Sequence, residues 1–166
     1  MEISRKTDYA IRMLAELVRS DEAIVSVRYA AEKNEVPYSF ARSIQHDLVQ
    51  AGIVTSVRGS RGGMMLAVDP RETTLKTIVE AIQGPICVAE CDTEGPMNGA
   101  CPFKESCSFS AIWCEAQRIL SDFFESITLY QVVIEERCPR LRDGRTFVAL
   151  TKDEYAALDQ GAPTEE

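Results

Sequence analysis

The chain has 166 residues, of which 45% are hydrophobic and 27% are charged, as expected for a globular protein with a sizeable core. Its net charge of −8 at pH 7 excludes a uniformly basic protein, but residues 1–70 hold nine basic and nine acidic residues, so the acidity belongs to residues 71–166. No run approaches the roughly 20 apolar residues of a membrane-spanning helix, so we expect no membrane association. The first residues lead directly into an amphipathic pattern rather than a signal peptide, so we expect a cytoplasmic protein.

Three short helices are predicted at the start of the chain. They span residues 4–19, 27–34 and 37–50. Ser4 and Ser26 are suitable N-caps for the first two, and apolar residues recur every three or four positions in the first helix. Pro37 suits the first turn of the third helix, and Gly52 can supply a left-handed cap after it.

A β-hairpin is predicted next. Two β-rich segments, residues 53–58 and 64–68, flank a glycine-rich turn at residues 59–63. A fourth helix is expected over residues 74–83. Three helices followed by a two-stranded hairpin is the order of a winged helix-turn-helix. We therefore predict a mainly α fold with a small β wing, in which residues 1–83 form a winged helix-turn-helix domain.

A long apolar helix is predicted over residues 108–134. Its apolar residues alternate between spacings of four and three: Phe109, Trp113, Ala116, Leu120, Phe123, Ile127, Tyr130 and Ile134. We expect residues 107–137 to form a dimerisation helix of a homodimer that also packs on the DNA-binding domain, with dimer contacts from Phe109, Trp113, Leu120, Phe123, Ile127 and Tyr130. The alternative is a helix buried against its own domain.

The last segment, residues 138–166, is expected to be an accessory tail. Residues 140–145 are basic and turn-rich and are predicted to form a linker, and residues 146–150 a strand. The sequence from Thr151 to Glu154 is that of a capping box, which predicts a short helix up to about Leu158.

The third helix and the wing hold the candidate DNA-contacting residues. In a helix-turn-helix the second helix of the motif enters the major groove, and its first turns face the base edges. The corresponding residues are Tyr38, Ser39, Arg42 and Ser43, with His46 one turn later. Arg42 is the best candidate base reader, because its fork matches guanine, although contact with a phosphate or an acidic neighbour is the alternative.

The wing and the first two helices add further candidates for contact with a double-stranded DNA operator. Arg58, Gly59 and Arg61 suit a narrow minor groove, unless the turn is simply solvated. Lys6 and Arg28 are expected to contact phosphates.

Six cysteines lie in the second half of the chain: Cys87, Cys91, Cys101, Cys107, Cys114 and Cys138. Cys91, Cys101 and Cys107 lie in or next to the polar segment 84–106, which we expect to be a cluster-binding loop. In the cytosol such a group favours metal or redox chemistry over disulfides. Three thiolates favour an iron–sulfur cluster whose fourth ligand is an oxygen or nitrogen group from elsewhere, including a partner subunit.

A zinc site formed by the same three cysteines and Cys87 remains an alternative, although no C-x2-C pair occurs. Cys114 lies inside the long helix and is expected to be a buried small hydrophobe. Cys138 is expected to be a free thiol in a connector.

Four features together carry a resemblance to a known family. They are the opening segment 3–12, the wing segment 56–63, the three cysteines with Trp113 six residues beyond Cys107, and the run 126–129. Over roughly residues 1–135 the chain resembles the Rrf-two family of winged-helix regulators, which includes IscR-like and NsrR-like iron–sulfur proteins. The resemblance implies that Cys91, Cys101 and Cys107 hold a two-iron or four-iron cluster. It also implies that Arg58 is the wing arginine and that the helix from Pro37 reads the major groove.

The chain also departs from this family pattern. IscR-like members place a histidine ligand three residues after the last cysteine, where this chain has Ser110. NsrR-like members use an aspartate of the first helix that reaches the partner subunit's cluster, and Asp8 matches that position, although an acid in a first helical turn is also favoured by the helix dipole. Nine residues separate the first two cysteines, a longer gap than in the best-known members, which keeps Cys87 as a substitute for Cys91. IscR-like members carry an acidic selectivity residue at the position of Arg42, so their operator sequence does not transfer.

We therefore expect an iron–sulfur-dependent transcriptional repressor that senses redox state, nitric oxide or iron–sulfur status, and we expect no enzymatic activity. The first alternative is a cluster-free regulator of the same fold that uses zinc, thiol redox chemistry or a protein partner. A small iron–sulfur electron carrier is a further alternative, but it would leave the arginines of the wing without a role.

Overall fold

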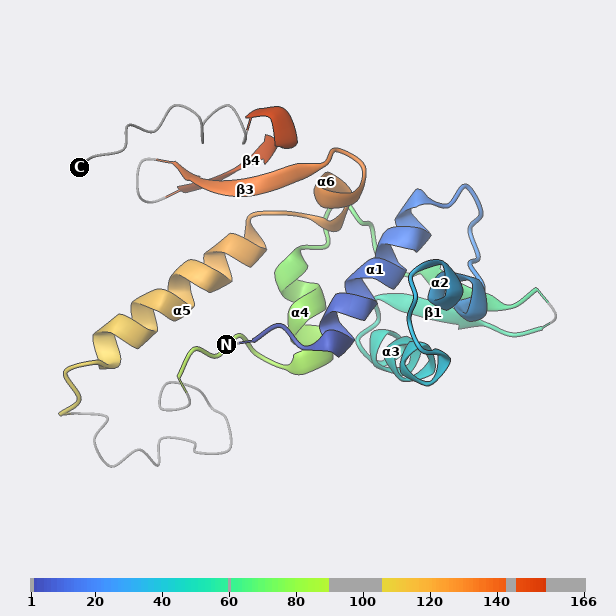
Figure 1. Cartoon of the computed structure of the whole chain (residues 1–166), viewed down its shortest axis with the longest axis horizontal. Coiled ribbons are helices and arrows are strands. Elements are labelled where there is room, and N and C mark those ends of the chain that lie inside the picture. Colours follow the sequence, from blue (N-terminus) through green and yellow to red (C-terminus); the bar gives the residue numbers. More distant parts are fainter. Residues whose placement is uncertain (1, 60, 90–105, 143–145, 155–166) are drawn as a thin grey trace.

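The computed structural model shows a helical domain from which one helix extends, with a separate β-hairpin near the C-terminus (Figure 1). It describes residues 2–59, 61–89, 106–142 and 146–154. No helix within these ranges is both long and apolar enough to cross a membrane.

The four helices predicted in the first half are present. They are α1 (Arg5–Arg19), α2 (Val27–Lys33), α3 (Tyr38–Gln50) and α4 (Leu75–Gln83). Ser4, Ser26 and Thr74 each accept a hydrogen bond from the backbone N–H three residues later, as N-caps do. Gly52 follows α3 with a φ of 71°, which is the left-handed conformation expected of that glycine.

The wing consists of strands β1 (Val54–Val57) and β2 (Gly63–Leu66), which pair antiparallel with Val57 opposite Gly63. Val25, in the connection between α1 and α2, exchanges two backbone hydrogen bonds of 2.8 Å with Met64 of β2. The base of the wing is therefore bound to the connection that leads into α2.

The core lies between α1, α3, α4 and the wing. Its largest fully buried side chains are Met13, Leu14, Ile44, Leu48, Ile53, Met64, Ile78, Ile127 and Leu129. The buried positions of α3 are one, three or four residues apart, as the helical period requires when one face meets the core, whereas α1 is buried on all sides from Met13 to Leu17.

The prediction of one continuous helix over residues 108–134 is wrong. The segment forms α5 (Ser110–Glu125) and α6 (Leu129–Val133), with a break between them. At the break, the N–H of Leu75 donates to the carbonyl of Ile127 (3.0 Å), and the N–H of Leu129 donates to the carbonyl of Thr73 (2.9 Å). These bonds to the start of α4 replace intrahelical ones.

The break changes the role of the predicted dimer residue Ile127. Its side chain is 0% exposed within its own chain, so it has no surface to offer a partner subunit. Tyr130, on α6, is half-buried, and the guanidinium of Arg71 lies 4.4 Å from the centre of its ring. The apolar spacing thus continues past α5 because α6 packs on its own domain, the alternative that the periodicity left open.

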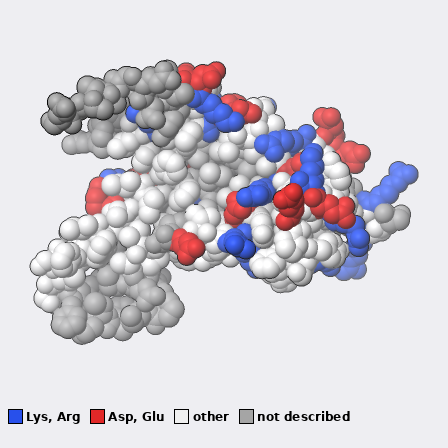
Figure 2. Space-filling model, in the orientation of Figure 1, with Lys and Arg blue, Asp and Glu red and all other residues white. Residues whose placement is uncertain are grey.

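Helix α5 itself extends away from the domain, and most of its surface seen in Figure 2 carries no charged side chain. None of its described residues is buried. Phe109 and Ile112 are 60% and 56% exposed, and Trp113 is exposed as well. So large an exposed apolar area on one helix indicates an interaction surface.

The C-terminal hairpin is formed by β3 (Arg137–Arg142) and β4 (Thr146–Thr151), which pair antiparallel. The strand predicted at residues 146–150 is therefore present, but residues 140–142 are part of a strand rather than a linker. Phe147 contacts Phe123 of α5 edge to face, with ring centres 5.5 Å apart. The capping box is confirmed by hydrogen bonds in both directions between Thr151 and Glu154, and its predicted helix beyond Glu154 lies outside the described residues.

Candidate nucleic-acid interface and cysteine loop

An open cleft of about 510 Å³ lies between the start of α2, the exposed face of α3 and the wing. The described residues that line it are Ser26, Val27, Arg28, Tyr38, Arg42, Gln45, Ser56, Val57, Arg58, Gly59, Gly62 and Gly63. Three of these residues are arginines, and none of the described lining residues is acidic. In a chain of net charge −8, this cleft is a local concentration of positive charge suited to an anionic ligand.

The exposed face of α3 carries all the residues predicted to face DNA from this helix. Ala41, Ile44, Gln45 and Leu48 are buried on its inner face. The five predicted residues Tyr38, Ser39, Arg42, Ser43 and His46 are exposed, as are Phe40 and Gln50. The same helical period that buries one face therefore presents these five side chains together.

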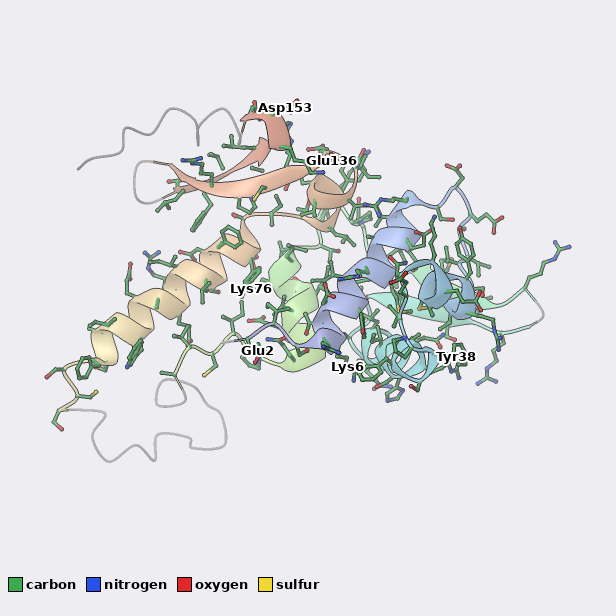
Figure 3. All side chains as sticks on the ribbon, viewed as in Figure 1. Glu2, Lys6, Tyr38, Lys76, Glu136 and Asp153 are labelled. Atoms are coloured by element: carbon green, nitrogen blue, oxygen red, sulfur yellow. The ribbon has the colours of Figure 1, made fainter. Side chains whose placement is uncertain are left out.

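Arg28 and Tyr38 connect the start of α2 to the start of α3. The guanidinium carbon of Arg28 lies 5.3 Å from the centre of the Tyr38 ring, within the range of a cation–π contact. Both side chains are exposed, and Figure 3 labels Tyr38 at the end of α3 that meets the cleft. The contact places the charge of Arg28 at the edge of the cleft.

Arg42 is held by a hydrogen-bonded chain that the sequence analysis did not predict. Its Nη1 donates to Oε1 of Gln45 (2.9 Å), and Nε2 of Gln45 donates to Oγ of Ser56 on β1 (3.1 Å). The chain joins α3 to the wing. The available sequence signal was a glutamine at a helix position that the apolar period assigns to the core, where a polar side chain requires partners.

The glycines of the wing are required by its backbone. Gly59 has a φ of 116°, a conformation that side chains disfavour. A Cβ on Gly62 would lie 2.3 Å from the carbonyl oxygen of Val57, and one on Gly63 would lie 2.2 Å from that of Val25. Arg58 and Arg61 are both exposed on this tight turn.

Lys6 is already engaged in the free protein. Its ammonium forms an ion pair with the carboxylate of Asp47 on α3, and Figure 3 shows it at the start of α1, beside α3. A phosphate contact from Lys6 requires this pair to open or to be shared.

The cysteine loop is described only at its two ends. Cys91 and Cys101, two of the three predicted cluster ligands, lie outside the described residues. Cys87 follows α4 and is half-buried, and Cys107 is half-buried just before α5. Among the described residues no group of three potential ligands from His, Cys, Asp and Glu comes together.

The two cysteines beyond the loop differ from the predictions made for them. Cys114 is exposed rather than buried, and it lines an open pocket between α5 and α4 together with Glu80 and Ile86. Cys138 is a free thiol, as predicted, but it lies in β3 rather than in a connector and is half-buried.

The first turn of α1 is bound to the end of α4, immediately before the cysteine loop. Oε1 of Gln83 accepts hydrogen bonds from the Thr7 hydroxyl (2.7 Å) and from the N–H of Ser4 (3.1 Å). Gln83 is the last residue of α4, and Gly84 follows it with a φ of 85°. The end of α4 and the first turn of α1 are therefore joined at a buried hydroxyl, since Thr7 is fully buried.

Asp8, the candidate fourth cluster ligand, lies in the first turn of α1. Its carboxylate forms an ion pair of 2.8 Å with Arg12, and both side chains are about half exposed. The carboxylate is therefore accessible from outside its own chain.

Comparison with known proteins agrees with these features. The Rrf2 family model, described as iron-dependent transcriptional regulator, matches residues 3–135. The chain is 30% identical over 132 residues to protein aau3 of Rhizobium meliloti (strain 1021), covering 80% of this chain and 82% of that protein. It is 25% identical over 144 residues to the HTH-type transcriptional regulator IscR of Vibrio parahaemolyticus serotype O3:K6, covering 86% of this chain and 83% of that protein.

The fold is shared with solved structures. CymR, the global cysteine regulator of B. subtilis, matches with a TM-score of 0.62 at 23% identity, covering 80% of this chain and 96% of that one. The order of helices and the wing define a winged-helix transcriptional regulator. The chain belongs to the Rrf2 family.

Proposed function

We propose that the protein binds a double-stranded DNA operator as a homodimer and that an iron–sulfur cluster on the cysteine loop controls this binding as a switch for repression. The observation that carries the DNA-binding part is the cleft between α3 and the wing, which gathers Arg28, Arg42 and Arg58 in an acidic chain. Such a surface suits the phosphate backbone, which supplies most of the affinity of DNA-binding proteins.

In this proposal α3 enters the major groove and the wing reaches the minor groove. Tyr38, Ser39, Arg42 and Ser43 face the base edges, because they are exposed side chains with polar groups in the first turns of α3. Arg58 and Arg61 enter the minor groove, where Gly59 and the tight turn allow the backbone to come close. Arg28 contacts a phosphate from the edge of the cleft. Lys6 contacts another phosphate when its ion pair with Asp47 opens.

The proposed dimer uses α5. Phe109, Ile112 and Trp113 are exposed apolar residues on this helix, and Leu120 and Phe123 continue the same spacing towards the hairpin. Pairing two such helices would remove these side chains from water and place the two DNA-reading surfaces on one assembly.

The donor set suits an iron–sulfur cluster better than structural zinc. Cys91, Cys101 and Cys107 offer three thiolates, and Ser110 replaces the histidine of the IscR-like pattern, so the fourth ligand must come from elsewhere. We propose that Asp8 of the partner subunit supplies it, because its carboxylate is about half exposed and pairs with the exposed Arg12. A bound cluster would supply sensitivity to oxidants, nitric oxide or iron supply.

The hydrogen bonds of Gln83 support a route from the cluster to the DNA. The loop begins directly after Gln83, which holds the first turn of α1 through Thr7. Lys6, in the same turn, is paired with Asp47 of α3. A change in the loop would therefore reach the helix that reads the bases by way of α1.

An electrophoretic mobility-shift assay at low salt with the protein's own upstream promoter region tests DNA binding. Arg58→Ala should weaken binding at least about tenfold, since a well-placed arginine contributes roughly 1–3 kcal/mol. Arg19→Ala, at the exposed end of α1 away from the cleft, removes the same charge and should have a small effect. Failure of the wild type to retard any fragment, or equal effects of the two variants, would contradict the proposal.

Anaerobic purification followed by visible spectroscopy and analysis of iron and sulfide tests the cluster. The wild type should be coloured and contain iron and sulfide, and Cys101→Ala should lose both. Cys138→Ala, in the C-terminal hairpin, should keep them. A colourless wild type loaded with zinc would refute the cluster proposal.

A cluster-free regulator is the second candidate, and the likeness of fold to CymR, a cysteine regulator, favours it. In that case the wild type would still bind its operator, but the purified protein would lack iron and sulfide, and Cys101→Ala would leave DNA binding unchanged.

A further inference from the structure

We propose that Gln45 is a specificity-determining residue, which sets the base preference of the protein by holding the Arg42 guanidinium in one orientation. The inference rests on the proposed DNA-binding function and adds a residue that does not itself need to touch DNA. The observation behind it is the chain of hydrogen bonds from Arg42 through Gln45 to Ser56.

The chemistry of the three groups defines the direction of this chain. A guanidinium can only donate, so the Gln45 atom that faces Arg42 must be the amide oxygen. The amide nitrogen of Gln45 then faces Ser56, whose hydroxyl can accept. Gln45 is only 6% exposed, so an unmatched amide there would be costly, and the observed orientation uses both of its ends.

The neutral amide leaves Arg42 able to read a base. A carboxylate in place of Gln45 would neutralise the guanidinium and compete with the DNA for it, whereas an amide oxygen accepts one hydrogen bond and leaves the charge. Only one of the five N–H groups of Arg42 is needed for this contact, so the others remain for DNA. The exposed side of the guanidinium can therefore still form a bidentate pair with the O6 and N7 atoms of guanine.

Orientation matters for a base and much less for a phosphate. A bidentate contact with guanine requires the guanidinium fork to lie in the plane of the base, whereas a phosphate is attracted from many directions. An exposed arginine without a holder samples several rotamers and must lose that freedom on binding. Gln45 therefore contributes mainly to the discrimination between bases and little to general affinity.

Ser56 extends the effect to the wing. It lies on β1 opposite Met64 and two residues before Arg58. The hydrogen bond from Gln45 to Ser56 is thus a direct polar link between α3 and the strand that leads to the wing arginine. The spacing between the major-groove contact and the minor-groove contact is held by the same chain.

The test measures binding to the operator, to operators with each base pair replaced in turn, and to unrelated DNA at the same salt concentration. Gln45→Leu removes both hydrogen bonds while keeping a buried side chain of similar size. We expect the preference at the base pair read by Arg42 to fall about tenfold, with binding to unrelated DNA changed less than about twofold. Gln50→Leu makes the same substitution at the exposed last residue of α3, which does not line the cleft, and should leave the preference at that base pair unchanged.

A double-mutant cycle shows whether Gln45 acts through Arg42. In an Arg42→Ala background, Gln45→Leu should cause no further loss of preference. Ser56→Ala, at an exposed strand position, is a second single variant that should fold normally and shift the preference in the same direction to a smaller extent.

The possible failures are distinguishable. If the wild type shows no preference for any operator, the proposed function itself fails. If the wild type discriminates but Gln45→Leu weakens binding to all DNA equally, or if its effect persists without Arg42, the inference is overturned. If Gln45→Leu does not fold and Ser56→Ala leaves the base preference intact, the inference is overturned as well.

Discussion

Ile127 and Ile112 offer a matched test of which apolar residues in segment 109–134 stabilise the domain and which stabilise the dimer. The two isoleucines lie in the same apolar segment, but Ile127 is 0% exposed against its own domain, whereas Ile112 is 56% exposed on α5. The same substitution to alanine at each position should therefore affect two different equilibria, the folding of the domain and the association of two chains.

The magnitude for Ile127→Ala follows from its burial. The substitution removes three carbon groups at about 0.8 kcal/mol each, which gives about 2.4 kcal/mol. The cavity left behind adds to this loss, so we expect about 3 kcal/mol, inside the range of about 2–5 kcal/mol seen for such changes in cores. For a chain of this size, a loss of about 3 kcal/mol corresponds to a fall in Tm of roughly 6–12 °C.

Chemical denaturation and sedimentation over a hundredfold range of protein concentration separate the two equilibria. Ile127→Ala should lower the free energy of unfolding by a similar amount at every concentration, and folded Ile127→Ala should dimerise like the wild type. Ile112→Ala should raise the dissociation constant of the dimer and lower stability only where dissociation accompanies unfolding.

The opposite pattern would refute the reasoning. If Ile127→Ala weakened dimerisation while leaving the stability of the domain unchanged, the break at residues 126–128 would be wrong and the segment would form one dimer helix. If Ile112→Ala lowered stability by about 3 kcal/mol at all concentrations, α5 would be buried against its own chain.

Three further predictions concern the wing, the ion pair between α1 and α2, and the start of the cysteine loop. Gly62→Ala should weaken operator binding at least about tenfold in a mobility-shift assay, with little loss of Tm in thermal denaturation. The added Cβ would lie 2.3 Å from the backbone carbonyl oxygen of Val57, so the turn of the wing must move. The pKa of Lys33 is raised by its hydrogen bond to the Glu16 carboxylate. The stability that this ion pair contributes is therefore complete below about pH 10.5 and is lost as the pH rises through the raised pKa. Alkaline denaturation of the wild type and of Lys33→Met would measure this loss. Gln83→Leu should lower the free energy of unfolding by about 1–3 kcal/mol in chemical denaturation, because the Ser4 N–H and the buried Thr7 hydroxyl both lose the amide oxygen that they share, and only the contact between the Thr7 and Ser4 hydroxyls remains.

Each of these has a matched control. Gly52→Asn introduces a residue that tolerates the left-handed conformation at a position outside the wing, so it should leave DNA binding intact. Lys33→Met should lose the alkaline dependence that the wild type shows, and equal pH profiles would contradict the role of the pair. Adding Thr7→Val to Gln83→Leu should recover part of the lost stability, since no buried hydroxyl then remains.

The fold of the first half could be predicted from sequence because its determinants are local. The caps at Ser4, Ser26 and Thr74 and the left-handed Gly52 act within one helical turn, so each helix boundary is readable from a few adjacent residues. The exposed residues of α3 follow from the same period that defines its buried face. The candidate DNA-contacting face was therefore predictable, including Arg42.

The features that the sequence could not show depend on partners distant in the chain. The break before α6 exists because the backbone of residues 127 and 129 pairs with that of residues 73 and 75, and a spacing of apolar residues cannot tell a domain core from a subunit interface. Strand β3, with the sequence RCPRLR, has little β pattern of its own and is a strand because β4 pairs with it. The exposure of Cys114 likewise depends on how α5 packs beside α4, where an open pocket remains.

The candidate site shows the same division. The residue types and the order of elements were sufficient to point to the wing arginines and to the cysteine loop, because positive charge, glycines and thiolates are visible one residue at a time. Only the tertiary structure brought Gln45 between Arg42 and Ser56 and joined Thr7 to Gln83, because a hydrogen bond depends on the positions of two atoms whose residues are separated by up to 76 positions in the chain. The sequence by itself determined which side chains are available to meet DNA, and packing decided how they are held.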